Sequence, residues 1–170
     1  GWAMRKETLR ACVAATALGA ERVLGEGMMG LFDGAPDGRG STAHVSAVLG
    51  LPVLLVVDAS AQAASAAALV HGFATFRSDT HVAGVLFNRV ASSRHAGLLR
   101  RACEPLGIPV VGCIEHALEL DLPERHLGLV QAAEHPSLHP FLERAADHVE
   151  RAIDLSALDA LCAPLIAVET

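Results

Sequence analysis

The sequence has very few aromatic side chains and only one lysine. Aromatic residues make up 4% of the 170 residues, and tyrosine is absent. A protein that binds single-stranded nucleic acid needs aromatic rings on which bases stack, and a duplex binder needs a basic surface. The net charge is −6, and the sequence contains no run of basic residues. We therefore expect no nucleic-acid partner.

Long apolar runs and a cysteine framework are missing as well. Gly, Asp and Gln interrupt every apolar run before it reaches the about 20 residues of a membrane span, and the first residues lack the apolar core of a signal peptide. We expect a cytoplasmic protein without a membrane partner. Four cysteines are scattered with no C-x-x-C pair: Cys12, Cys103, Cys113 and Cys162. We expect them to be small buried residues in a reducing compartment.

The sequence is rich in small and branched apolar residues, with a hydrophobic content of 52%. A chain of 170 residues is long enough for one domain with a substantial core. Apolar runs typical of strands alternate with segments of helical periodicity. This alternation, with short connections, predicts an α/β fold with a doubly wound, mostly parallel sheet flanked by helices.

The expected elements follow from these patterns. Strands are predicted at 23–26, 53–58, 82–88, 108–113 and, as a short fifth, 127–130. Helices are predicted at 5–18, 41–49, 62–76, 92–106 and 138–153. The β-branched run at 53–58 is typical of a strand buried on both faces. Ser41 is expected to cap the second helix, and Gly107 to end the fourth.

A glycine-rich segment follows the first predicted strand. Six glycines and one proline lie between Gly25 and Ser41, and the carboxylates of Glu26 and Asp33 lie in the same stretch. Open α/β sheets hold ligands and metal ions at the carboxyl ends of their strands. We therefore expect this segment to be a functional loop.

The phosphate-binding loop that usually accompanies such a sheet, G-x-x-x-x-G-K-[ST], is absent from these residues. The single lysine, Lys6, is followed by Glu7, and no G-x-G-x-x-G opens a helix after a strand. The nucleotide site of this chain is therefore expected to be incomplete. We expect the 170 residues alone to be inactive.

Six short blocks resemble the cobyrinic acid a,c-diamide synthase family in order and spacing. They are 26–34, 40–43, 56–60, 84–90, 107–112 and 122–130. The first and last blocks are specific, whereas the middle strands are shared with dethiobiotin synthetase. The resemblance implies an incomplete P-loop NTPase fold, with the phosphate-binding segment before Gly1 and a glutaminase domain after Thr170. It predicts that residues 1–160 are the central part of the synthetase domain and residues 161–170 the start of a linker.

The resemblance implies an ATP-dependent, glutamine-hydrolysing carbon–nitrogen ligase of cobalamin biosynthesis. Enzymes of this family amidate the a and c carboxylates of cobyrinic or hydrogenobyrinic acid through an acyl phosphate, with Mg²⁺. The implied partners are the corrinoid substrate, ATP and glutamine-derived ammonia. A homodimer is an open alternative for the oligomeric state. The alternative hypothesis is a non-catalytic, dethiobiotin-synthetase-like module that binds a nucleotide or regulates an attached enzyme.

The resemblance also implies roles for individual residues. Glu26 matches the acid that holds the metal, and Asp33 the acid on the substrate side, so both are candidate catalytic residues. Asn88 matches the residue that reads the adenine edge in the wider superfamily, with a turn-forming role as the alternative. Arg125 and His126 match an Arg-His pair. The Arg fork suits a carboxylate or phosphate, and docking of the loop is the alternative.

Asp58 ends the central strand, where it can support the metal site or cap the following helix. Some positions depart from the family's usual residues. Ile114, Glu115 and His116 stand where Leu-Pro-Arg is common, so a phosphate contact by a basic residue is not expected there.

Overall fold

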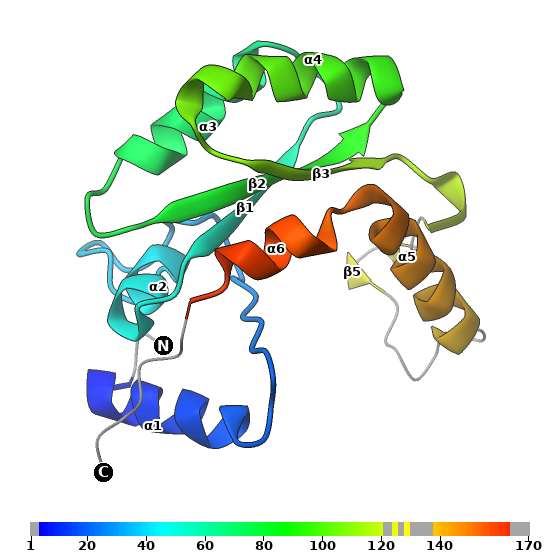
Figure 1. Ribbon diagram of the computed structural model, residues 1–170. Coiled ribbons are helices and arrows are strands. Elements are labelled where there is room, and N and C mark those ends of the chain that lie inside the picture. The colour runs from blue at the N-terminus through cyan, green and yellow to red at the C-terminus, as the bar shows by residue number, and fades with distance from the viewer. Residues whose placement is uncertain (1–3, 121–123, 126–127, 130–137, 164–170) are drawn as a thin grey trace.

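The computed structural model describes residues 4–120, 124–125, 128–129 and 138–163 (Figure 1). A three-stranded parallel sheet lies at its centre, with strand order β1-β2-β3. The strands are β1 (Val53–Asp58), β2 (Val82–Val90) and β3 (Val110–Glu115). Together with the helices on both of its sides, this sheet confirms the predicted α/β fold.

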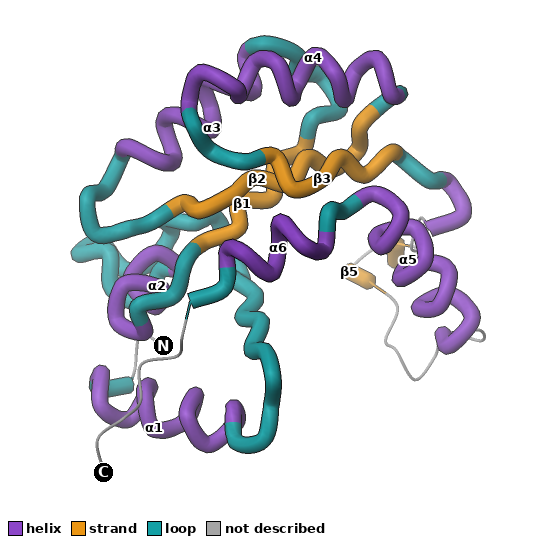
Figure 2. Tube along the Cα trace, in the orientation of Figure 1, coloured by secondary structure: helices purple, strands orange, loops and turns teal. Residues whose placement is uncertain are grey.

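Helices cover both faces of the sheet, as the purple segments around the orange strands show in Figure 2. α3 (Ser65–Thr75) and α4 (Ser93–Cys103) pack together on one face. α5 (Leu138–Ala152) and α6 (Leu155–Leu161) lie on the other face, where α6 contacts β2 and β3. The sheet is therefore the middle layer of three.

The remaining elements are short or lie outside the central layers. They are α1 (Lys6–Ala17), α2 (Thr42–Leu49), the 3₁₀ turns η1 (Glu104–Leu106) and η2 (Leu118–Leu120), and the strands β4 (Glu124–Arg125) and β5 (Gly128–Leu129). In the described part of the chain no helix has the length and apolar character that crossing a membrane requires.

Side chains at the helix ends explain where these helices begin and stop. Ser41 Oγ accepts the backbone N–H of His44 at 3.1 Å, which caps α2 as predicted. Ser92 caps α4 in the same way. Gly107 ends the turn after α4 with a φ of 66°, a left-handed conformation that glycine adopts without steric cost. The helix boundaries are therefore encoded locally.

The core is built from aliphatic side chains and one phenylalanine. Phe87, Leu99, Val70 and Val85 are the largest of its fully buried residues. They come from β2, α3 and α4, so the layer between the sheet and these two helices is the main core. The interior is therefore packed mainly with aliphatic side chains, in keeping with the low aromatic content of the sequence.

On the opposite face of the sheet, Gly112 lets another part of the chain lie close to β3. A Cβ on Gly112 would lie 2.8 Å from the carbonyl oxygen of Ala152 and 2.7 Å from Leu86 Cδ1. Beside it, Ile153 forms a bridge with Gly112, and Asp154 N donates to Val111 O at 2.8 Å. The chain between α5 and α6 therefore crosses β3 at backbone distance.

The predicted strand at 23–26 is wrong: these residues form no strand, and Leu24 is 90% exposed. A strand needs a hydrogen-bonded neighbour, and in the described residues none pairs with this segment. The expectation that 53–58 is buried on both faces is also wrong, since Val56 is 59% exposed. The side chain of Val56 lies on a sheet face that no described element covers at this position.

The short strand predicted at 127–130 is found only in part. β5 pairs antiparallel with β4 in a separate two-stranded sheet, so it does not extend the parallel one. The other residues of that predicted strand lie outside the described residues.

The prediction of four buried cysteines holds for only one of them. Cys103 is buried and Cys113 half-buried, whereas Cys12 and Cys162 are exposed. Burial raises the pKa of both the Cys103 and the Cys113 thiol. These two thiols therefore stay protonated at neutral pH and act as small apolar residues.

A pair of glycine substitutions tests the close crossing on β3. Gly112→Ala should lower the free energy of unfolding by about 1–3 kcal/mol, because the Ala152 carbonyl must move away from the new methyl group. Gly72→Ala is the control, since Gly72 lies in α3 with no atom within 4 Å of an added Cβ. It should raise the free energy of unfolding by roughly 0.5–1 kcal/mol. Urea denaturation followed by circular dichroism measures both, and a Gly112→Ala protein as stable as Gly72→Ala would contradict the packing described.

Candidate functional site

The parallel strands β1 and β2 end side by side. Asp58 at the end of β1 is the register partner of Asn88 on β2, and Ala59 N donates to Asn88 O at 2.9 Å. This edge holds the carboxyl ends of the strands, where open α/β sheets bind their ligands. The structure thus brings together two of the residues that the sequence singled out.

Asn88 is exposed, although the strand before it is buried from Leu86 to Phe87. Its side-chain Oδ1 accepts the backbone N–H of Arg89 at 2.9 Å. Its side-chain nitrogen donates to none of the residues that the structure describes. As far as the described residues go, the amide group of Asn88 is therefore held at its oxygen, and its nitrogen is available to a ligand.

Asp58 stabilises the loop that leaves β1. Its Oδ1 accepts the backbone N–H of Ser60 at 2.9 Å, and its backbone carbonyl accepts Gln62 Nε2 at 3.0 Å. The Ser60 N–H, aided by the Arg89 guanidinium, lowers the pKa of the Asp58 carboxyl below its usual value. The prediction that Asp58 caps the following helix is wrong, because the N-cap residue of α3 is Ala64 and Asp58 bonds the loop before the helix.

His95 fastens this loop to the neighbouring one. Its Nδ1 accepts the backbone N–H of Ala91 at 3.1 Å, so the ring proton is on Nε2. Nε2 donates to the Gln62 carbonyl at 2.6 Å. The loops after β1 and after β2 are therefore tied to each other, which fixes the edge that carries Asp58 and Asn88.

Sequence analysis missed both Arg89 and His95. Arg89 Nη1 lies 3.4 Å from Asp58 Oδ2, and its backbone has a φ of 54°, which is uncommon for a residue other than glycine. His95 could have been singled out in the sequence, because it stands three residues after Ser92, the residue that caps α4. No sequence signal marks the conformation of Arg89.

Glu26 and Asp33 lie apart from this edge. Both are exposed, and neither side chain has a hydrogen bond or ion pair with a described residue. Phe32 stacks on Phe73 near the end of α3, with ring centroids 5.6 Å apart. The loop that holds Asp33 therefore packs near the last turn of α3, whereas Asp58 precedes the first (Figure 1).

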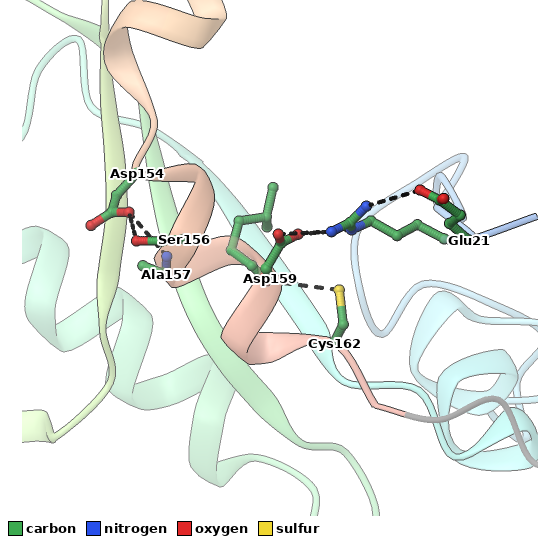
Figure 3. A network of polar contacts seen from close by, with 8 residues as sticks. Glu21, Asp154, Ser156, Ala157, Asp159 and Cys162 are labelled. Atoms are coloured by element: carbon green, nitrogen blue, oxygen red, sulfur yellow. Dashed lines mark hydrogen bonds and ion pairs between the residues drawn. The ribbon is translucent and has the colours of Figure 1, made fainter.

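The segment before Glu26 is anchored to α6 by an ion pair. Arg22 Nε and Nη2 each donate to one carboxylate oxygen of Asp159 at 2.8 Å. Figure 3 shows this network, in which Asp154 also caps α6 by accepting the Ala157 N–H at 3.0 Å. The Ser156 hydroxyl and this N–H lower the pKa of Asp154. This ion pair links the segment before Glu26 to α6, although that segment forms no strand.

The other predicted residues are placed only in part. The backbone of Arg125 lies in β4 opposite Gly128, and His126 lies outside the described residues. No group of three or more His, Cys, Asp or Glu side chains that could hold a metal occurs among the described residues. A lone carboxylate such as Glu26 fits only a Mg²⁺ ion that keeps water and phosphate as its other ligands.

Comparison with known proteins gives one consistent result. The chain is similar to "hydrogenobyrinate a,c-diamide synthase" of Brucella anthropi, with 55% identity over 94% of this chain and 37% of the relative. The protein of that name from Rhizobium meliloti is 51% identical over 99% of this chain and 39% of the relative. The protein of that name from Agrobacterium fabrum is 46% identical over 96% of this chain and 38% of the relative.

The chain thus spans somewhat more than a third of the length of these curated relatives. No family model matches the sequence. No solved structure matches it either.

Proposed function

Because the chain belongs to the family of hydrogenobyrinate a,c-diamide synthases, we propose that it is the central part of an amide-forming synthase of cobalamin biosynthesis that acts in the cytoplasm. The observation that carries the proposal is an identity of 46–55% over nearly the whole chain. The name of these relatives favours hydrogenobyrinic over cobyrinic acid as the corrinoid.

The chemistry of amide formation explains why such an enzyme would use ATP. A carboxylate does not react with ammonia in water, so it must first be converted to an acyl phosphate. Ammonia released from glutamine then displaces the phosphate. A Mg²⁺ ion supplies positive charge where phosphoryl oxygens gain negative charge during the transfer.

The residues of this chain would share the work of binding and positioning. Asn88, at the carboxyl edge of β2, would contact the adenine edge through the side-chain nitrogen that no described residue engages. Glu26 would hold the metal, and Asp33 would orient the substrate carboxylate or the ammonia. Arg125 and His126 would bind a corrinoid carboxylate or a phosphate.

The position of Glu26 and Asp33 fits a division of labour between the two acids. Asp33 N donates to Gly30 O at 3.0 Å, which makes a turn, and Leu31 between them is buried. The burial of Leu31 fixes this turn to the core, and the Asp33 carboxylate lies back against Gly30 within the turn. Because six residues separate Asp33 from Glu26 in the sequence, we propose that the two carboxylates act on different groups.

The first prediction concerns the phosphates. The 170-residue chain alone should not hydrolyse ATP, because its single lysine, Lys6, lies in α1 and no phosphate-binding loop is present in these residues. Phosphate release is measured beside that of a full-length synthase carrying the same segment. Release from the chain well above the buffer rate, and abolished by chelating Mg²⁺, would contradict this expectation.

The second prediction concerns the base. In a full-length synthase carrying this segment, Asn88→Ala should raise the KM for ATP more than it lowers kcat, the result of losing binding common to ground and transition states. It should also reduce the preference for ATP over GTP. Gln62→Ala is the matched control, since that amide lies at the same edge but is bonded to Asp58 O. An unchanged nucleotide preference in Asn88→Ala would instead support a turn-forming role.

The third prediction separates the two acids. In the same full-length enzyme, Glu26→Gln should lower kcat by about 100-fold or more through loss of a charged ligand, and added Mg²⁺ or Mn²⁺ should restore part of it. Asp33→Asn should respond little to metal and should hydrolyse ATP without forming amide. Counting phosphate and amide separately over a Mg²⁺ titration decides the matter, with exposed Glu21→Gln as control. If the two variants respond to metal in the same way, the division of labour is wrong and both acids bind the same ion.

A further inference from the structure

The residue that follows Glu26 lies against the first residue of α2. It is Gly27, and a Cβ added to it would run into Thr42 Oγ1 and would lie 2.9 Å from Thr42 Cγ2. Non-bonded heavy atoms pack best at about 3.5–4.0 Å, so neither contact could be accommodated without movement. The chain therefore passes Thr42 at a distance that suits only glycine.

Rotation of the Thr42 side chain does not make room for a larger residue at position 27. Threonine carries two heavy atoms on Cβ, and these fill two of the three staggered positions. Both atoms lie next to Gly27. Any other staggered rotamer still leaves a heavy atom in at least one of these two positions. A methyl group at position 27 would therefore displace the backbone, to which Glu26 is directly attached.

The residue that follows Asp33 packs in a similar way against the backbone just before α2. It is Gly34, and an added Cβ would lie 2.8 Å from Arg39 O and 2.8 Å from Ser41 N. Both are backbone atoms, which cannot turn aside as a side chain can. Neither Gly34 nor Gly27 has a positive φ. Lack of space, and not the backbone conformation, therefore calls for glycine at the two positions.

Hydrogen bonds hold the start of α2 in place. Ser41 is 0% exposed, and its Oγ donates to Gly38 O at 2.9 Å while it accepts the His44 N–H. Ala43 N donates to Leu31 O at 2.9 Å, which ties the chain between the two acids to the helix. A segment that is pushed away from this part of the molecule therefore moves relative to a fixed support.

We propose that Ser41 and Thr42 form a platform that positions the two acids. Thr42 acts on the first acid through Gly27, and the Ser41 backbone acts on the second through Gly34. Both act through a neighbouring glycine, so they are positioning residues. The proposal rests on the proposed function in one respect, the roles of the two acids in catalysis.

Alanine substitutions in a full-length synthase carrying this segment test the platform. Gly27→Ala should lower kcat by about 10- to 100-fold, because the metal-holding acid is displaced, and added Mg²⁺ or Mn²⁺ should restore part of it. Gly34→Ala should instead hydrolyse ATP without forming amide, as Asp33→Asn does. Gly25→Ala is the matched control on the other side of Glu26, because no described atom lies within 4 Å of an added Cβ. Its kcat should stay within about twofold of the parent value.

A second substitution, at Thr42, tests whether space is the cause. Gly27→Ala combined with Thr42→Ala should return kcat to within about threefold of Thr42→Ala alone, because both heavy atoms that block the methyl group are gone. Thr42→Val is the matched control, since valine also carries two heavy atoms on Cβ and lacks only the hydroxyl. It should not rescue Gly27→Ala. Thr42→Ala should not rescue Gly34→Ala either, because backbone atoms are in the way there.

Three kinetic results would overturn the proposal. The first is a failure of Thr42→Ala to rescue Gly27→Ala, and the second is an equal rescue by Thr42→Val, which would implicate the hydroxyl and not space. The third is an equal loss of kcat in Gly25→Ala and Gly27→Ala. Should Gly34→Ala fail to fold, the double variants at positions 27 and 42 still decide the matter.

Crystal structures of the same variants give a readout that does not depend on activity. In Gly27→Ala the backbone of residues 26–27 should lie farther from Thr42 Cβ than in the parent enzyme, and Thr42→Ala should bring it back. An undisplaced backbone would overturn the proposal whatever the kinetics. If the backbone moves but Glu26→Gln shows no loss that metal restores, the platform stands and the metal role of Glu26 is wrong.

Discussion

The parallel pairing of β1 with β2 is the interaction on which the rest of the structure depends. It runs in register from Leu54 and Gly84 to Asp58 and Asn88, so the two strands end at the same level. Because the strands are parallel, the loops that leave them start from one edge, and both lead into helices on the same face. The two contacts that link the strand ends, Arg89 with Asp58 and His95 with Gln62, follow from this alignment.

Much of the fold could be predicted because its signals are local. The apolar runs of β1 and β2, the capping serines Ser41 and Ser92, and Gly107 each specify an element within a few residues of sequence. The errors arose where the outcome depends on distant residues. Residues 23–26 have the composition of a strand, yet a strand forms only beside a partner, and in the described chain none is paired with them.

In the candidate site, too, some features could be predicted from local sequence signals, whereas others depend on distant residues. The positions of Asp58 and Asn88 at adjacent strand ends could be predicted, since parallel strands bring their carboxyl ends together. The left-handed backbone of Arg89 could not be predicted, because it lies where β2 shifts its register against β3, between Phe87 and Val90. The separation of Asp33 from that edge could not be predicted either, since it depends on the stacking of Phe32 against α3.

The ion pair between Arg22 and Asp159 has a consequence for how the chain assembles during synthesis. Its two partners are 137 positions apart, so the pair can form only after α6 has left the ribosome. The β1–β2 pair and α4 are made earlier and close much shorter loops, which costs less chain entropy. The ion pair at the stretch just before Glu26 can thus form only after both strands of the sheet edge that carries Asn88 have been synthesised.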